Sequence, residues 1–247
     1  MKKIIFWTAL ISILGLLIGA CSKRSAEDAT TAFVESCDDT TASGSITIGS
    51  DTASGTYLQL TSNESSNSLP ATGCNQGGDY STDPSMPTGT QSVLKKKIIT
   101  SSTSFVDHVS YYSDTACTSR LGYLEKRYSN LSVGDTVSGL DNSSGGRPTS
   151  GYRVTYKPEC AKIMADTDAA MVTFNTAYAA FFHIYPMTTG TEKAFCETWA
   201  CQVQTYYSIW GAGDNGTTFS IYQAMGGSAG YEPSDWDDNS GGTTFQK

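Results

Sequence analysis

The chain has 247 residues, of which 38% are hydrophobic and 16% charged, with 24 Asp and Glu against 16 Lys and Arg. Its formal net charge of −8 opposes nucleic-acid binding, which requires clustered Lys and Arg to displace counterions from phosphates. The length is sufficient for one domain with a sizeable core. Composition therefore excludes a nucleic-acid partner and favours a single acidic domain.

The first residues have the pattern of an export signal. Two lysines precede an apolar run from Ile4 to Leu17, which is too short to span a membrane comfortably. The following Ile18-Gly19-Ala20-Cys21 resembles the lipobox of bacterial lipoproteins. This resemblance implies that residues 1–20 are a signal peptide that is removed, and that Cys21 is acylated. An uncleaved transmembrane anchor or an ordinary signal peptide is the alternative.

Acylation at Cys21 would hold the protein at a membrane through lipid rather than through a helix. Each buried acyl methylene contributes about 0.8 kcal/mol, so two or three chains form a stable anchor. Ser22 follows the cysteine, and in enterobacterial lipoproteins a residue other than Asp here resembles the signal for export to the outer membrane. We therefore expect a cell-envelope location, at the outer membrane in preference to the inner membrane.

Residues 21–43 are predicted to comprise the lipidated cysteine and a flexible tether. They are rich in Ser, Thr, Ala and Asp and lack a sustained apolar period. Such a segment cannot bury enough apolar surface to offset its ordering entropy. Residues 44–247 have a different texture and no convincing internal boundary, which predicts a single β-rich domain.

Within this domain, short β-branched and aromatic segments alternate with Gly, Ser, Asn and Asp clusters, as in antiparallel strands joined by turns. The predicted strands are Ser45–Ser50, Gly55–Thr61, Ser92–Ser101, Ser104–Tyr112, Leu121–Leu131, Gly151–Lys157, Ala200–Trp210 and Thr217–Tyr222, with a short Thr243–Phe245 at the end. Turns are predicted at Ser113-Asp114, Val133-Gly134-Asp135, Asp141–Gly146 and Gly211–Gly216. About eight to ten strands of this kind avoid exposed edges most simply by closing into a barrel.

One segment departs from the β pattern. From Asp166 to His183 aromatic and other apolar side chains recur at intervals of three and four residues, which predicts an amphipathic helix. Asp166 or Thr167 can cap its start, and Pro186 follows its end. The helix is expected before the last hairpin. Its aromatic stripe is expected to pack against the sheet or close a barrel end rather than form a cofactor site.

Six cysteines follow Cys21, an even number in a chain predicted to be exported. An oxidising compartment favours three disulfides, but the sequence does not select the pairing. A zinc site is disfavoured because the closest spacing lacks a Cys-x-x-Cys pair and a nearby His. We therefore predict no metal or other cofactor. The disulfide candidates are Cys37, Cys74, Cys117, Cys160, Cys196 and Cys201.

Four segments together resemble lipocalin-like bacterial lipoproteins. They are Ser54-Gly55-Thr56-Tyr57, Tyr111–Cys117, Tyr128–Gly134 and Tyr206–Trp210. Tyr57 stands where the group usually has Trp, and a long insertion from Asn63 to Gln91 follows that strand. The resemblance implies an antiparallel up-and-down meander that closes into a barrel or cupped sheet. It also implies an apolar ligand in the mouth of the barrel. The residues expected to line it are Tyr123, Tyr206, Trp210, Phe219 and Tyr222.

The sequence contains no coherent catalytic set, and we predict that the protein is not an enzyme. His108 lies in a predicted strand, where a cross-strand contact is the favoured role, and His183 lies at the predicted helix end. Ser228 fits a Gly-x-Ser-x-Gly pattern, but no His follows residue 183 and the required strand and helix are missing. Lys95-Lys96-Lys97 is the densest basic run and favours a guard against edge-to-edge strand association over an anionic-ligand patch.

The expected function is therefore that of a lipid-anchored, non-catalytic binding protein for a small apolar ligand. The alternative is a surface lipoprotein with a filled core that acts through exposed loops in adhesion or envelope assembly. The two differ in whether the barrel interior can accept a molecule, which depends on side chains that face inward. The protein partner and the ligand are not determined by these patterns.

Overall fold

The chain divides into two compact units, Met1–Glu35 and Ser36–Lys247. The computed structural model describes residues of the second unit only, so the predicted signal peptide and Cys21 lie outside the described residues. Within the described part, no helix has the length and apolar character needed to cross a membrane. The described residues are 37, 40–59, 74–76, 86–140, 148–178, 186–195, 204–214, 219–224, 233–236 and 242–247.

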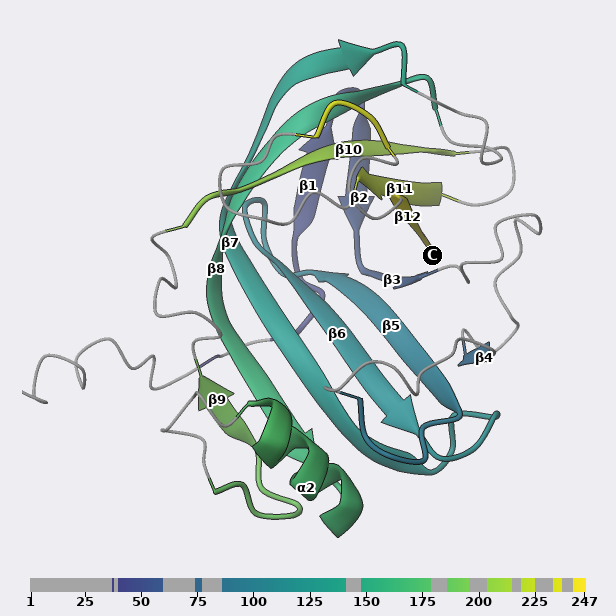
Figure 1. Cartoon of the computed structure of the whole chain (residues 1–247). Coiled ribbons are helices and arrows are strands. Elements are labelled where there is room, and N and C mark those ends of the chain that lie inside the picture. The colour runs from purple at the N-terminus through teal and green to yellow at the C-terminus, as the bar shows by residue number, and fades with distance from the viewer. Residues whose placement is uncertain are drawn as a thin grey trace, which may run out of the picture. The chain divides into compact units, whose positions relative to one another are not determined.

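The described part of the second unit is mainly β (Figure 1). Helix α2 (Asp168–Ala177) lies between β8 and β9 in sequence. The strands are β1 (Ser45–Ile48), β2 (Asp51–Ser54), β3 (Thr56–Gln59), β4 (Asn75–Gln76), β5 (Ser92–Ile99), β6 (Phe105–Tyr112), β7 (Arg120–Ser138), β8 (Ser150–Ala165), β9 (Lys193–Phe195), β10 (Tyr206–Asp214), β11 (Phe219–Ala224) and β12 (Gly242–Gln246).

Eight of these strands close into an antiparallel barrel. The neighbours in order are β3, β5, β6, β7, β8, β10, β11 and β12, and β12 pairs with β3 to complete the circle. Strands β4 and β9 add to this sheet by pairing with β5 and β8. Closure satisfies backbone groups that an open sheet would leave at its edges. The predicted lipocalin-like, up-and-down barrel with one helix before the last hairpin is confirmed.

Strand β7 runs straight through a predicted turn. The turn at Val133-Gly134-Asp135 was expected to end the strand, and this prediction is wrong. The pairing of β7 with β8 shifts register between Val133 and Thr136, so the extra residues are accommodated as a bulge. A bulge uses the same Gly-containing sequence as a turn, which is why the pattern was ambiguous.

Strand β8 is also longer than predicted, since it continues past Lys157 to Ala165. Pro158 falls inside it, opposite Tyr128, at a register shift between β7 and β8. A proline lacks the N–H that a regular ladder requires, and an irregularity tolerates it. Strand β10 likewise extends to Asp214, into the loop predicted at Gly211–Gly216.

The first predicted strand is in fact the start of a hairpin. Strands β1 and β2 form a separate two-stranded sheet joined at Gly49-Ser50. Gly49 has φ of 65°, and a Cβ there would clash with the hydroxyl of Tyr152, so glycine is required on both grounds. Ile46 and Ile48 of this hairpin are buried in a core cluster with the barrel residue Trp210.

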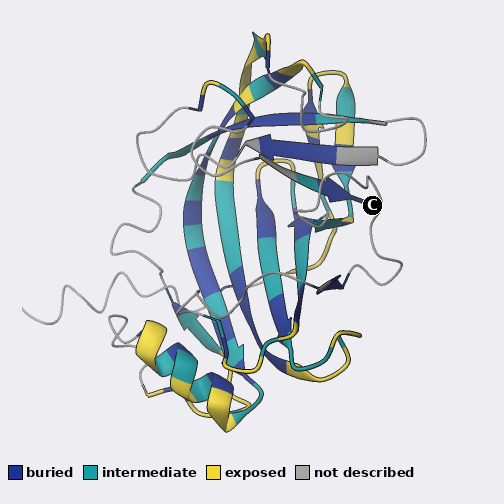
Figure 2. Cartoon of the chain, turned by 45° about the vertical axis from the view of Figure 1, so that its right-hand side comes forward, coloured by how far each residue is buried: buried dark blue, intermediate teal, exposed yellow. Residues whose placement is uncertain are grey.

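Helix α2 covers a second core cluster. Of the two predicted caps, Asp166 and Thr167, it is Thr167 that caps the helix start by accepting a hydrogen bond from the N–H of Ala170. Ala170 and Phe174 are buried against barrel residues such as Ile163, whereas the other side of the helix is exposed (Figure 2). The described helix ends at Ala177, before the predicted end, and residues 179–185 lie outside the described residues.

Part of the predicted tether is attached to the barrel. Cys37 forms a disulfide with Cys160 of β8. The Ser43 hydroxyl donates to the carbonyl of Thr100, and the N–H of Gly44 donates to the carbonyl of Ile99. A free tether can therefore extend only as far as Cys37.

Candidate functional site

The inner face of the barrel carries charged side chains that the sequence analysis assigned to another role. Because side chains alternate along a strand, Lys95 and Lys97 of β5 face one side and Lys96 faces the other. Strand β5 pairs with β3 and β4 on one flank and with β6 on the other, so it is not an edge strand. The predicted role of the lysine run as an edge guard is therefore wrong.

Lys97 is the most deeply buried charged side chain among the described residues, with 0% exposure. Its Nζ lies 2.5 Å from Oδ1 of Asp107, its cross-strand partner on β6. The same Nζ lies 4.2 Å from the ring centre of Phe105, 5.0 Å from that of Trp210 and 4.8 Å from that of Phe245. Aromatic faces attract a cation, so rings and carboxylate together hold the ammonium group.

Burial shifts the pKa values of two side chains in this region, Lys97 and Tyr156. Desolvation lowers the pKa of Lys97, and the charge and hydrogen bond of Asp107 oppose that effect. Desolvation also raises the pKa of Tyr156, with further contributions from Asp107 and Tyr206, against a hydrogen bond from Gln223. Tyr156 therefore remains a neutral phenol at physiological pH.

The middle of the inner face is accessible to water. Asp107 shares this face with Lys97, yet its side chain is 31% exposed. Tyr128 and Tyr206 pack against the core cluster that contains Ile46 and Ile48 of the β1–β2 hairpin, and both remain half-buried. Val109 packs against the core cluster that contains Ala170 and Phe174 of α2, and it is also half-buried. Solvent therefore reaches side chains on the same face of the sheet as the two core clusters.

Two buried polar atoms in this region have no hydrogen-bond partner in the described part of the chain. The first is Nε1 of Trp210, a residue with 0% exposure. The second is Oε1 of Gln223, which pairs with Trp210 across β10 and β11. Buried donors and acceptors usually find partners, so such atoms mark places where a polar group can be added.

The structure brings only some of the five predicted ligand residues together. Tyr206 and Trp210 lie in the same inner cluster. Tyr222 faces the opposite side of β11 and packs with Trp236 in a separate cluster. The phenol of Tyr123 donates to Glu192, and its ring stacks on His108. Phe219 lies in β11, opposite Asp214, and its side chain is outside the described residues.

His108 has the cross-strand role that the sequence analysis favoured. Its Nδ1 lies 3.0 Å from Oε2 of Glu125, its partner on β7, and its Nε2 lies 2.8 Å from Oγ of Ser110. A hydroxyl, an imidazole and a carboxylate in this order also occur in serine hydrolases. Here Ser110 is 3% exposed, so its oxygen is shielded from a substrate. We interpret the three residues as a polar ladder that satisfies buried groups on the outer face.

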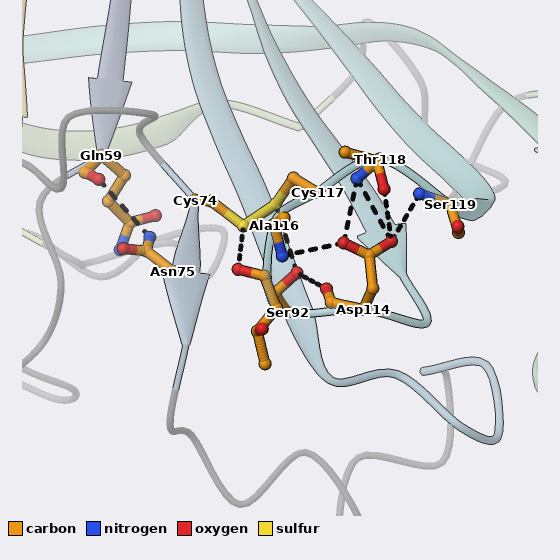
Figure 3. The surroundings of a disulfide bond; sticks show 10 residues. Gln59, Cys74, Asn75, Ser92, Asp114, Ala116, Cys117, Thr118 and Ser119 are labelled. Atoms are coloured by element: carbon orange, nitrogen blue, oxygen red, sulfur yellow. Dashed lines mark hydrogen bonds between the residues drawn. A yellow bond between two sulfur atoms is a disulfide. The ribbon is translucent and has the colours of Figure 1, made fainter.

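Two disulfides from the predicted set are present. Cys37 pairs with Cys160 and Cys74 pairs with Cys117, with Cα atoms 5.8 Å and 5.9 Å apart. The second disulfide joins Cys74, the residue before β4, to the loop between β6 and β7 (Figure 3). The hydroxyl of Ser92 lies 3.2 Å from Sγ of Cys117.

Asp114 organises the loop that carries Cys117 (Figure 3). Its carboxylate accepts hydrogen bonds from the N–H groups of Ala116, Thr118 and Ser119, at 2.8, 3.2 and 2.5 Å. Desolvation acts to raise the pKa of Asp114, but these bonds together lower it to about 2. Asp114 and Cys117 belong to the Tyr111–Cys117 segment that underlies the lipocalin-like resemblance, so the structure gives them a structural role.

The remaining candidates are Cys21, Cys196, Cys201, His183 and Ser228, and they lie outside the described residues. Comparison of the sequence with known protein families finds no match, and comparison with curated proteins finds none either. The Lys97 and Asp107 pair was missed because each residue was considered on its own strand. The sequence holds only a partial signal, since the predicted strands Ser92–Ser101 and Ser104–Tyr112 place Lys97 opposite His108, one residue from Asp107.

Proposed function

We propose that this protein is a non-catalytic, lipid-anchored lipoprotein of the cell envelope that binds a small, mainly apolar ligand inside its barrel. The observation that carries the proposal is the 31% exposure of the Asp107 side chain on the inner face, since it requires accessible space between two apolar clusters. Small-molecule sites are typically mostly apolar with a few placed polar groups.

The walls of this space fit such a ligand. Tyr128 and Tyr206 offer half-buried ring surface, and Phe105 and Trp210 lie behind them in the same cluster. Aromatic rings supply large contact area with little loss of conformational freedom. The envelope location rests on the lipobox resemblance at Cys21, and the two disulfides are consistent with an oxidising compartment.

The alternative is a surface lipoprotein with a filled core that acts in adhesion or envelope assembly. It is favoured by the covering of two regions of the barrel, by the β1–β2 hairpin and by α2. Under this alternative, the accessible space near Asp107 holds only water.

Native mass spectrometry separates the two functions. Residues 22–247 would be exported to an oxidising compartment, purified, and weighed before and after denaturation. The carrier function predicts a bound small molecule that leaves only on unfolding. A preparation that is ligand-free and does not take up apolar probes would contradict the carrier function and favour the alternative.

The anchor has an independent test in the full-length chain. Changing Cys21 to Ser should block processing and release the protein from membranes, because the acyl chains would be absent. Ser22→Ala is the matched control and should remain anchored, because it changes the neighbouring residue and keeps the cysteine. A processed, membrane-bound Cys21→Ser protein would refute lipidation at this site.

A further inference from the structure

We propose that the outer face of β8 around Cys160 is the side of the barrel that faces the membrane, and that the disulfide between Cys37 and Cys160 holds it there. The partner of this surface is an anionic lipid bilayer. This inference rests on the proposed lipid anchor at Cys21 and adds the orientation of the barrel above the bilayer.

The described N-terminal residues are attached to the barrel at two places. The N–H of Gly44 donates to the carbonyl of Ile99 at the end of β5, and the N–H of Ile99 donates to the carbonyl of Gly55, which precedes β3. The second attachment is the disulfide from Cys37 to Cys160 of β8. In the closed barrel β8 lies four strands from β3 in either direction. The disulfide therefore moves the first fixed point of the chain from the side of β3 and β5 to the side of β8.

Cys160 lies on the outer face of β8. Its neighbour Ala161 belongs to the core cluster that contains Ile163. Because side chains alternate along a strand, Cys160 points away from this cluster, as does Lys162. The segment that leads to the anchor is therefore attached to the outer wall of the barrel.

The predicted tether is short relative to the folded domain. Cys37 is 16 residues after Cys21. A flexible tether of this length has a root-mean-square end-to-end distance of about 22 Å. A compact domain the size of the second unit, Ser36–Lys247, is roughly 40 Å across. With the acyl chains in the bilayer, the side that carries Cys160 is therefore held nearer to the membrane than the side that carries β3.

Two ion pairs lie beside Cys160 on this outer face. Nε of Arg127, the cross-strand partner of Cys160, lies 3.1 Å from Oε2 of Glu159, and Nζ of Lys162 lies 3.7 Å from Oε1 of Glu192. These pairs carry no net charge, whereas the whole chain has a net charge of −8. An anionic bilayer repels carboxylates, so a face whose carboxylates are paired approaches it at a lower electrostatic cost.

The test measures lysine labelling of the full-length, acylated protein in vesicles of phosphatidylcholine and phosphatidylglycerol. Sulfo-N-hydroxysuccinimide acetate modifies accessible amines, and peptide mass spectrometry gives the rate at each lysine. Lys162 reports on the proposed membrane side. Lys247 is exposed and follows β12, the neighbour of β3, so it reports on the opposite side. Relative to the same protein in detergent micelles, we expect vesicles to slow the labelling of Lys162 about threefold and to leave Lys247 unchanged.

Loss of the bridge should remove this protection. The double variant Cys37→Ser/Cys160→Ser keeps the anchor but returns the first fixed point to the side of β3 and β5. Lys162 should then be labelled at the same rate in vesicles and in micelles. The matched control is Cys74→Ser/Cys117→Ser, which removes the other disulfide and should retain the protection.

The outcomes separate this inference from the anchor on which it rests. Failure of the wild-type protein to bind vesicles would overturn the lipid anchor. Vesicle binding without slower labelling of Lys162 would leave the anchor in place and overturn the orientation. Protection of Lys162 that persists without the bridge from Cys37 to Cys160 would overturn the role of the disulfide.

A longer tether covers the case in which the variant without the bridge does not fold. Insertion of about 20 Gly and Ser residues after Glu35 leaves both disulfides in place and raises the root-mean-square length of the tether to about 33 Å. Lys162 should then lose most of its protection, because the barrel can turn further relative to the bilayer. Unchanged protection of Lys162 in this variant would contradict an orientation set by the tether.

Discussion

Lys97 and Asp107 are cross-strand neighbours that differ in exposure, since the lysine is fully buried and the aspartate side chain is 31% exposed. Their ion pair places a cation among three aromatic rings in the barrel interior. A buried ion pair is weak evidence for stability, because desolvation can exceed the Coulombic gain. The pair is therefore expected to add little net stability, although removal of one partner can be costly.

The unequal exposure predicts unequal effects of mutation on stability. Asp107→Asn leaves the buried ammonium group of Lys97 without a carboxylate partner, and it should lower the free energy of unfolding by about 3 kcal/mol. Lys97→Met leaves a carboxylate that water reaches and should cost no more than about 1 kcal/mol. Urea unfolding of the ligand-free protein measures both. A larger loss in Lys97→Met than in Asp107→Asn would contradict this account of the pair.

Asp114 should make stability depend on pH in the acid range. Its pKa in the folded protein is about 2, below the ordinary value of 3.8, so the ionised form stabilises the fold. That contribution is complete above pH 3.8 and is lost as the pH falls toward 2. The melting temperatures of wild type and Asp114→Asn should therefore differ most above about pH 4 and converge near pH 2. A constant difference across this range would refute the role of the carboxylate.

The disulfides should contribute unequally. Cys37 and Cys160 are 123 residues apart, and Cys74 and Cys117 are 43 apart. Each bridge typically stabilises by about 2–4 kcal/mol, with more from the longer loop. Paired Cys→Ser variants, followed by urea unfolding, should show the larger loss for Cys37 and Cys160.

Gly151 should not tolerate a side chain. A Cβ there would lie 2.7 Å from Ile209 and 2.8 Å from the ring of Trp236, which is fully buried. Gly151→Ala should therefore lower the free energy of unfolding by about 1–3 kcal/mol through overpacking. Gly213→Ala is the matched control, because no atom lies within 4 Å of its added Cβ. Equal stability of the two variants in urea would contradict this packing.

Ser110 should be unreactive as a nucleophile. Its hydroxyl contacts His108 but is buried, and the polar ladder satisfies it. A fluorophosphonate probe should therefore leave the intact mass of the folded protein unchanged. An adduct on Ser110 that disappears in His108→Gln would instead reveal a hydrolase and refute the non-catalytic proposal.

Much of the fold follows from local patterns. Alternating β-branched and aromatic segments predicted β5, β6 and β11, and the apolar period with Thr167 predicted the start of α2. The errors occurred where one local sequence fits two structures. Gly134-Asp135 suits a turn as well as a bulge, and pairing with β8 selects the bulge.

The Lys97–Asp107 ion pair can be predicted from the sequence only when the register between β5 and β6 is known. The predicted strand ends Ser101 and Ser104 place Lys97 opposite His108, whereas the observed turn at residues 100–104 places it opposite Asp107. Which of the two sheet faces is inward, however, depends on closure between β12 and β3, far apart in the chain. The separation of Tyr222 and Tyr123 from Trp210 has the same origin, because a one-residue step along a strand reverses the face.

By itself, the sequence determined the β-rich class, the position of the helix, the cysteines available for disulfides and the resemblance of its start to a lipoprotein signal. These features depend on side-chain type and short spacing. Only the tertiary structure decided which cysteines pair, which lysines face inward and which aromatic rings surround them. Those outcomes depend on contacts between residues distant in sequence, which no local pattern specifies.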